Sequence, residues 1–178
     1  MWWFSEAITI MLFTSFGAFL VVSIGAKRQH CSITILRRAL ATVSSCQLLR
    51  ILSFTATQLP APSQHCQPGN ATALERPNSV WDFLKVDVKR QASQGCGDLV
   101  FSSHVTFGLV FALSMWHYSR DRRLHLAMAV LLALQCYGIL ASRKHYTLDV
   151  VVALYAVPLV WDVLLRRLPD PSNGVTGR

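Results

Sequence analysis

The chain has 178 residues, of which 52% are hydrophobic, and its mean hydropathy of +0.37 is too high for an ordinary soluble domain of this size. The formal net charge of +8 would suit a nucleic-acid partner, but the basic residues lie between apolar blocks, so we expect no nucleic acid. We therefore predict one all-α, polytopic transmembrane helical bundle over residues 1–168 and a disordered cytosolic tail over residues 169–178.

Five apolar blocks approach the length of about 20 residues that a helix needs to cross the hydrocarbon. They cover residues 7–26, 39–59, 99–116, 124–141 and 147–165. A signal peptide is the alternative for the first block, but the N-terminus lacks the basic residue that such a peptide carries, so we expect a retained helix. Trp2 and Trp3 suit an aromatic anchor at the membrane interface.

The basic residues predict the orientation of the spans. Three clusters fall on one side of the membrane if the spans alternate: Lys27, Arg28, Arg37 and Arg38; Arg120, Arg122 and Arg123; Arg166 and Arg167. The positive-inside rule makes that side the cytosol. The loop over residues 59–98 and the turn over residues 142–146 are then expected to face the lumen or the exterior.

The long outer loop carries features whose roles the sequence leaves open. Asn70 begins an Asn-Ala-Thr sequon and is a candidate glycosylation site. Cys66 and Cys96 either form a disulfide in an oxidising lumen or remain free thiols. Residues 79–90 mix apolar and charged side chains, which fits either a lid over the site or an ordinary solvated loop.

A histidine and a carboxylate stand four residues apart at the start of the fifth block. If a helix begins near residue 145, His145 and Asp149 share one face and can touch. A carboxylate bonded to one imidazole nitrogen fixes the tautomer and leaves the other nitrogen to attack or to take a proton. The alternative is a structural pair at a helix start.

A second histidine, His104, lies at the outer end of the third block, at the same membrane depth as His145. Two histidines suit phosphoryl transfer, in which one attacks phosphorus and the other protonates the leaving alkoxide. No cysteine–histidine set has zinc spacing, so we expect neither a metal nor a cofactor. Asp98, about one turn before His104, serves either as a helix N-cap or directly in the site.

Cations complete the candidate site. Arg50 lies well inside the second block, where a cation is costly and usually paired, and a phosphate or an acidic side chain would satisfy it. Arg143 lies two residues before His145 and is a further candidate for binding phosphate oxygens. Together with Asp98 and Ser102, these residues form the predicted phosphate-binding set.

Two motifs carry a resemblance to a known family. Cys96-Gly97-Asp98 followed by Ser102-Ser103-His104 resembles the CGDxxxSGHT motif of sphingomyelin synthases and related sphingolipid synthases. Residues 145–150, HYTLDV, resemble the HYTxDV motif of the same family, and residues 57–62, TQLPAP, resemble its TxLPxP segment. This family is part of the lipid phosphate phosphatase, or PAP2-like, superfamily.

The resemblance implies an enzyme that moves a phospho-head group from a glycerophospholipid to ceramide and releases diacylglycerol. It implies His145 as the nucleophile, Asp149 as the group that positions it, and His104 as the acid and then the base. Its partners would be membrane lipids, and its place the Golgi or another endomembrane, or the plasma membrane.

The chain departs from the family pattern at Ser103, where the family has glycine, and at Val105, where it has threonine. The family usually has six spans, so five imply that the first helix is missing or the chain is incomplete. A hydrolase that uses water as acceptor and an inactive lipid-binding membrane protein remain the alternatives. Whether the head group is choline, ethanolamine or inositol, and the oligomeric state, stay open.

Overall fold

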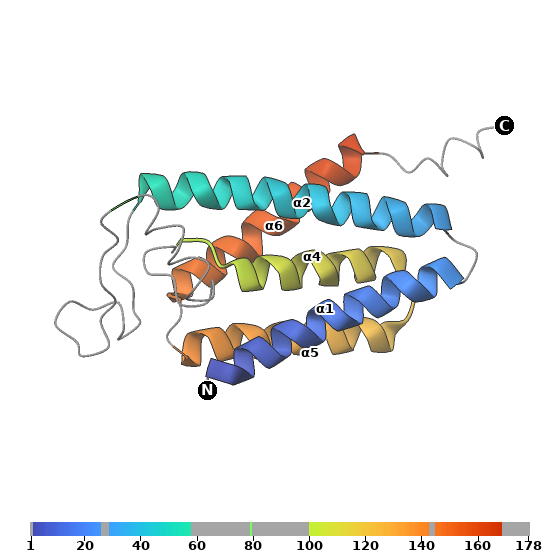
Figure 1. Ribbon diagram of the computed structural model, residues 1–178, viewed down its shortest axis with the longest axis horizontal. Coiled ribbons are helices and arrows are strands. Elements are labelled where there is room, and N and C mark those ends of the chain that lie inside the picture. Colours follow the sequence, from blue (N-terminus) through green and yellow to red (C-terminus); the bar gives the residue numbers. More distant parts are fainter. Residues whose placement is uncertain (1, 26–28, 58–78, 80–99, 143–144, 169–178) are drawn as a thin grey trace.

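The structure, a computed structural model, describes residues 2–25, 29–57, 79, 100–142 and 145–168, and these contain helices but no strand. The helices are α1 (Trp2–Gly25), α2 (Gln29–Ala56), α4 (Ser103–Tyr118), α5 (Arg122–Ala141) and α6 (Thr147–Arg167). Figure 1 shows them side by side, alternating in direction. The starts of α1, α4 and α6 meet the ends of α2 and α5 at one end, which we call the N-terminal end. The predicted all-α bundle is confirmed.

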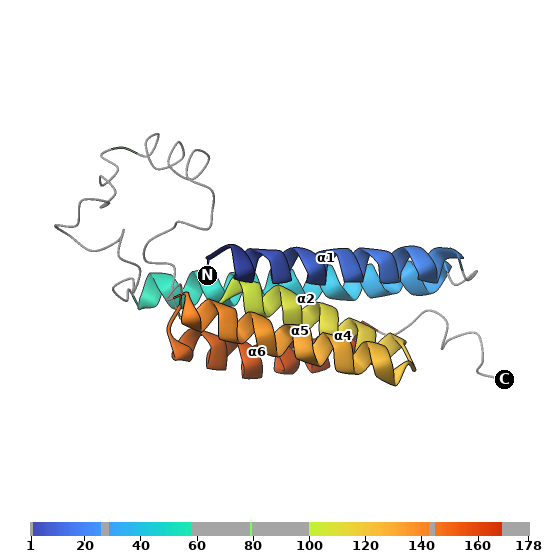
Figure 2. The same cartoon turned by 90° about the horizontal axis from the view of Figure 1, so that it is seen from below.

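Helix α4 is the centre of the bundle. It packs against each of the other four helices, while α1 also packs against α2 and α5, and α2 against α6. Figure 2 shows α1 and α2 as one layer over α4, α5 and α6. Nine of the 16 residues of α4 are buried, so this helix offers most of its surface to protein and little to the surroundings.

The outer faces of the bundle suit a membrane. By length and composition, three described helices can cross one, along Trp3–Ile24, Arg122–Ala141 and Thr147–Arg167. Large apolar side chains point outward, with Val22 69%, Leu48 63% and Leu159 63% exposed, which is the surface that lipid tails require. Helix α4 has only 16 residues and α2 is less apolar, so membrane crossing by these two stays a prediction.

The second helix begins ten residues before the second apolar block. Arg37 and Arg38, which precede that block, lie within α2 because this helix begins at Gln29. The side chain of Arg38 is buried: Nε donates to the carbonyl oxygen of Leu168 at 3.0 Å, and Nη1 donates to the hydroxyl of Tyr118. Because these acceptors satisfy the guanidinium, the helix can continue through a cation that ties α2 to the ends of α4 and α6.

Close contact among α1, α4 and α5 depends on one glycine and one buried amide. Gln135 is fully buried, and its Nε2 donates to Thr9 Oγ1 at 2.9 Å. A Cβ at Gly108 would lie 2.5 Å from Gln135 Oε1 and 3.1 Å from the side chain of Leu132. A larger residue at this position, one turn beyond His104 on α4, would therefore displace the ends of these buried side chains.

Several predictions fall outside the described residues. They concern Asp98, Arg143, the sequon at Asn70, and the pairing of Cys66 with Cys96. The lid over residues 80–90 and the tail over residues 169–178 are also among them. All of these stay predictions.

Candidate active site

Asp149 is the buried centre of the candidate site. It lies in the first turn of α6, where backbone N–H groups and the helix dipole favour a carboxylate. Its Oδ2 accepts from the backbone N–H of Tyr146 at 3.0 Å and lies 2.9 Å from Nδ1 of His145. The side chain of Asp149 is fully buried and that of His145 is 11% exposed. The contact expected from the four-residue spacing is present, although α6 begins at Thr147 and His145 precedes the helix.

The same carboxylate also holds the start of α4. Oδ1 of Asp149 accepts from the backbone N–H of Val100 at 2.7 Å, and the backbone carbonyl oxygen of Asp149 accepts from the backbone N–H of Ser102 at 3.3 Å. Val100 has a φ of 85°, which costs a β-branched residue about 1–3 kcal/mol. The two hydrogen bonds to Asp149 offset the cost of this backbone conformation. The turn thereby places the start of α4 next to the start of α6.

The N-cap position of α4 belongs to Ser102. Helix α4 begins at the next residue, Ser103, and the role of Asp98 lies outside the described residues. The Oγ of Ser102 is buried and has no hydrogen-bond partner in the described part of the chain. Its role in phosphate binding stays a prediction.

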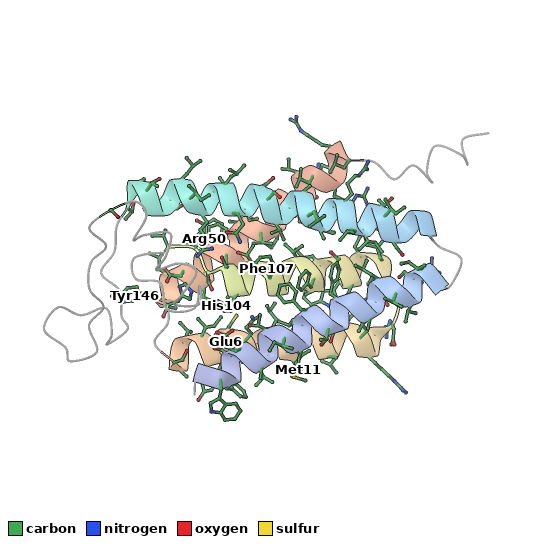
Figure 3. The ribbon with its side chains drawn as sticks, in the orientation of Figure 1. Glu6, Met11, Arg50, His104, Phe107 and Tyr146 are labelled. Atoms are coloured by element: carbon green, nitrogen blue, oxygen red, sulfur yellow. The ribbon has the colours of Figure 1, made fainter. Side chains whose placement is uncertain are left out.

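His104 faces both the second histidine and a carboxylate from another helix. The ring centroids of His104 and His145 are 6.5 Å apart, at an interplanar angle of 67°. The Nε2 of His104 lies 3.6 Å from Oε1 of Glu6 on α1, and both side chains are partly exposed, at 23% and 31%. Figure 3 shows Glu6, His104 and Arg50 near the same end of the bundle, each from a different helix.

Glu6 is a site residue that the sequence analysis missed. It stands directly before the first apolar block, which contains no charge. A signal was available, because an acidic side chain at the edge of a membrane span is the feature that drew attention to Asp149. What the spacing could not show is that α1 turns this carboxylate toward α4.

Arg50 donates to neutral oxygens of two helices, and the phosphate or acidic partner expected for it stays a prediction. Its Nη1 donates to Oγ of Ser103 and, at 3.1 Å, to Oε1 of Gln47. The Nε2 of Gln47 also donates to Oγ of Ser103, at 3.3 Å. Neutral oxygens of α2 and α4, including the hydroxyl that departs from the family motif, therefore accept from the cation. Burial and these contacts hold it at the N-terminal end.

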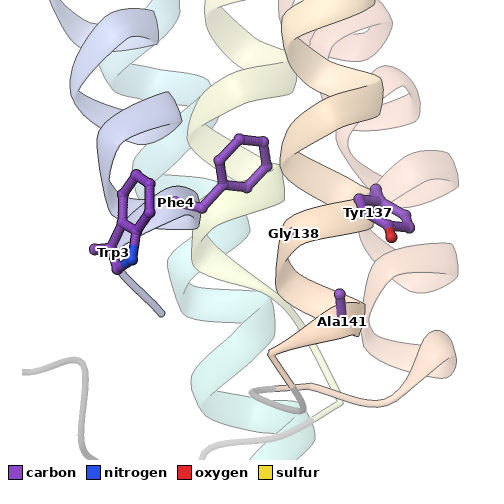
Figure 4. A pocket seen from close by; sticks show the side chains of 5 residues that line it. All are labelled: Trp3, Phe4, Tyr137, Gly138 and Ala141. Atoms are coloured by element: carbon purple, nitrogen blue, oxygen red, sulfur yellow. The ribbon is translucent and has the colours of Figure 1, made fainter. Parts of the chain in front are cut away.

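An apolar pocket of about 260 Å³ lies at the same end, between α1 and α5. Figure 4 shows its lining: Trp3, Phe4, Tyr137, Gly138 and Ala141. No histidine, arginine or carboxylate belongs to this lining. The pocket is thus separate from the charged cluster formed by α1, α2, α4 and the start of α6.

Two histidines, each beside a carboxylate, provide the kinds of groups that acid–base and nucleophilic chemistry uses. His145 has a bonded carboxylate at one ring nitrogen, and His104 has a carboxylate of its own. Residues 95–166, which contain both histidines, match the family described as PAP2 superfamily C-terminal. The site and the fold thus define a PAP2-like membrane protein.

Proteins of similar sequence are named as ceramide phosphotransferases. The chain is 39% identical over 176 residues to a phosphatidylinositol:ceramide inositolphosphotransferase of Oryza sativa subsp. indica, covering 96% of this chain and 54% of the relative. It is 37% identical over 180 residues to phosphatidylinositol:ceramide inositolphosphotransferase 3 of Arabidopsis thaliana, covering 98% and 61%. A phosphatidylethanolamine:ceramide ethanolaminephosphotransferase of Trypanosoma brucei brucei is 34% identical over 111 residues, covering 61% and 33%.

No solved structure matches the chain. The chain is thus similar to ceramide phosphotransferases over nearly its whole length, and residues 95–166 match the PAP2 superfamily. It spans 54% and 61% of the lengths of the two plant relatives.

Proposed function

We propose that the protein transfers the phosphoinositol head group of phosphatidylinositol to the primary hydroxyl of ceramide and releases diacylglycerol. The plant relatives, similar over nearly the whole chain, are named for this reaction. The trypanosome relative is named for an ethanolamine head group, so the choice of head group differs among relatives. We therefore base the choice of inositol on the similarity to the plant relatives, and the class of reaction on the geometry of the site.

The observation that carries the proposal is the bond between His145 and Asp149 next to a second histidine. With Nδ1–H donated to the carboxylate, the Nε2 of His145 keeps a lone pair for attack on phosphorus. The rings of His104 and His145 are neighbours, with centroids 6.5 Å apart, which supports a role for both at one phosphoryl group.

In the first half-reaction, His145 forms a bond to phosphorus as the bond from phosphorus to the diacylglycerol oxygen breaks. His104 gives that oxygen its proton, so neutral diacylglycerol leaves. The carboxylate of Glu6, 3.6 Å from Nε2 of His104, favours the protonated ring that this step requires.

In the second half-reaction, His104 accepts the proton of the ceramide hydroxyl. The ceramide oxygen attacks phosphorus and the bond to His145 breaks, which restores both histidines to their initial states. Water in place of ceramide would turn the same steps into hydrolysis. We propose that this end of the bundle faces the lumen or exterior, because the described arginine clusters outside the site lie at the opposite end.

The test is a transfer assay on the whole chain in liposomes that contain labelled ceramide and either phosphatidylinositol, phosphatidylethanolamine or phosphatidylcholine. We expect inositol phosphoceramide from the first donor, and no product from the His145→Ala variant. His104→Gln should lower the rate by about 10²–10⁴-fold, the usual contribution of a general acid or base.

His117→Gln is the matched control, because His117 lies on the same helix at the opposite end and is exposed. Its rate should equal that of the unmodified chain. Transfer from phosphatidylethanolamine or phosphatidylcholine alone would refute the inositol assignment. Release of free inositol phosphate without a ceramide product would show a hydrolase, and an active His145→Ala variant would remove this histidine from the mechanism.

A further inference from the structure

Ser103, Gln47 and Arg50 form a closed hydrogen-bonded triangle between α2 and α4. Arg50 Nη1 donates to Ser103 Oγ and to Gln47 Oε1, and Gln47 Nε2 donates to Ser103 Oγ. All three side chains are partly exposed, so the triangle lies at the surface of the site and is not sealed in the core. The family motif has glycine in place of Ser103, so the motif itself supplies no hydroxyl here.

The hydrogen-bonding capacity of a hydroxyl decides what Ser103 can do. A serine hydroxyl has two lone pairs and one proton. Arg50 and Gln47 donate to its oxygen, which occupies both lone pairs. The group is left to act as a donor, and a guanidinium on its oxygen strengthens that donor because it draws electron density from the O–H bond.

The position of this donor suggests its acceptor. Ser103 is the first residue of α4, directly before His104, whose ring faces His145, so both residues lie at the N-terminal end of the bundle. The cation on α2 makes this wall of the site positive, which suits an anion. We propose that Ser103 is a phosphate-binding residue, whose hydroxyl, held by Gln47 and Arg50, donates to a non-bridging oxygen of the transferred phosphoryl group.

The proposal rests on the proposed function for its substrate, while its ligand chemistry, a phosphate oxygen, does not depend on which lipid supplies it. An opposite role for the same triangle makes the opposite prediction. If the hydroxyl oxygen occupied the place of a phosphate oxygen on Arg50, its removal would free the cation and tighten phosphate binding.

The experiment compares the whole chain with Ser103→Ala, Ser103→Gly and Ser103→Thr variants in two assays. One measures kcat and KM for lipid transfer, and the other measures the affinity for inorganic phosphate by calorimetry in detergent micelles. We expect the alanine and glycine variants to lose about tenfold or more in kcat/KM and in phosphate affinity, since a bond to a charged group is lost. The threonine variant keeps the hydroxyl and should stay within about threefold of the unmodified chain.

Thr55→Val is the matched control, because Thr55 also lies on α2, is exposed, and its hydroxyl donates to carbonyl oxygens of its own helix. It should change neither quantity. Equal or tighter phosphate binding by the alanine and glycine variants would overturn the proposal, and so would equal loss in the threonine variant. If the unmodified chain binds phosphate and the variants do not, while no lipid product forms, the proposed function fails and this inference stands.

Discussion

Replacing Asp149 with asparagine removes one negative charge at nearly constant volume, so its effect comes from hydrogen bonding and not from a cavity. The carboxylate accepts from the backbone N–H groups of Val100 and Tyr146 and contacts Nδ1 of His145. An asparagine has one acceptor oxygen and one NH₂ group. Whichever way it is turned, at least one buried backbone N–H then faces another donor.

One unsatisfied donor costs about 1–3 kcal/mol, and the loss of the charge weakens the bond that remains, so the free energy of unfolding should fall by about 2–4 kcal/mol. The effect on the rate should be larger. If the NH₂ group faces Nδ1, it favours the tautomer that carries its proton on Nε2, which removes the lone pair needed for attack. If the oxygen faces Nδ1, a neutral group replaces the carboxylate that stabilises the positively charged ring. A loss of about 10⁴-fold is expected, the cost of the same exchange in a serine-protease triad.

The assay is the liposome transfer rate, measured beside thermal unfolding in detergent. Asp162→Asn is the matched control, because Asp162 lies on the same helix, is 53% exposed, and pairs with Arg166 at the surface. That change should leave the rate unaltered and cost under about 1 kcal/mol. If Asp149→Asn kept more than a tenth of the rate while remaining folded, the assigned role of the tautomer would be wrong.

Four other substitutions test three separate parts of the structure. Glu6→Gln should slow transfer by about tenfold or more without unfolding the bundle, because it removes the charge beside His104, and steady-state rates check this. Gly108→Ala should destabilise by about 1–3 kcal/mol through overpacking, whereas Gly17→Ala, whose added Cβ has no described atom within 4 Å, should stabilise by about 0.5–1 kcal/mol; thermal melts measure both. Arg38→Met should cost roughly 2–3 kcal/mol, seen in the same melts, because it removes the donors to two other helices.

Each of these has a contrary outcome. An unchanged rate in the glutamine variant would show that the carboxylate is only a surface neighbour of the histidine. Equal melting temperatures for the two alanine variants would mean that the tight packing of α4 is relieved at no cost. An unchanged melting temperature for Arg38→Met would show that its contacts are no better than those it makes with water in the unfolded chain.

Contacts within one helix, or at its start, could be predicted from the sequence because a helix fixes the spacing of its residues. The four-residue interval between His145 and Asp149 predicted their contact, and a hydrogen bond of 2.9 Å joins them. Alternation of the helices likewise predicted that His104 and His145 lie at one end, and their rings are 6.5 Å apart. Both predictions needed only helix geometry and the order of the blocks.

Helix boundaries were harder to predict, since they depended on distant partners. The apolar block from residue 99 suggested that a helix begins there. Instead, the backbone N–H groups of Val100 and Ser102 donate to Asp149, and the helix begins only at Ser103. Arg37 and Arg38 lie before the second apolar block, yet α2 already includes them, and Arg38 has acceptors at the ends of α4 and α6. Local pattern contains no information about such acceptors.

By itself, the sequence determined the all-α membrane fold, the contact between His145 and Asp149 at the start of α6, and the end of the bundle at which this pair lies. Hydropathy, residue spacing and the alternation of helices can all be read from the order of residues along the chain. Only the tertiary structure decided that Glu6 meets His104 and that Arg50 meets Ser103. Those contacts join different helices. They depend on how each helix is rotated and how closely the glycine and the buried amide let it approach, and the packing of the whole bundle sets both.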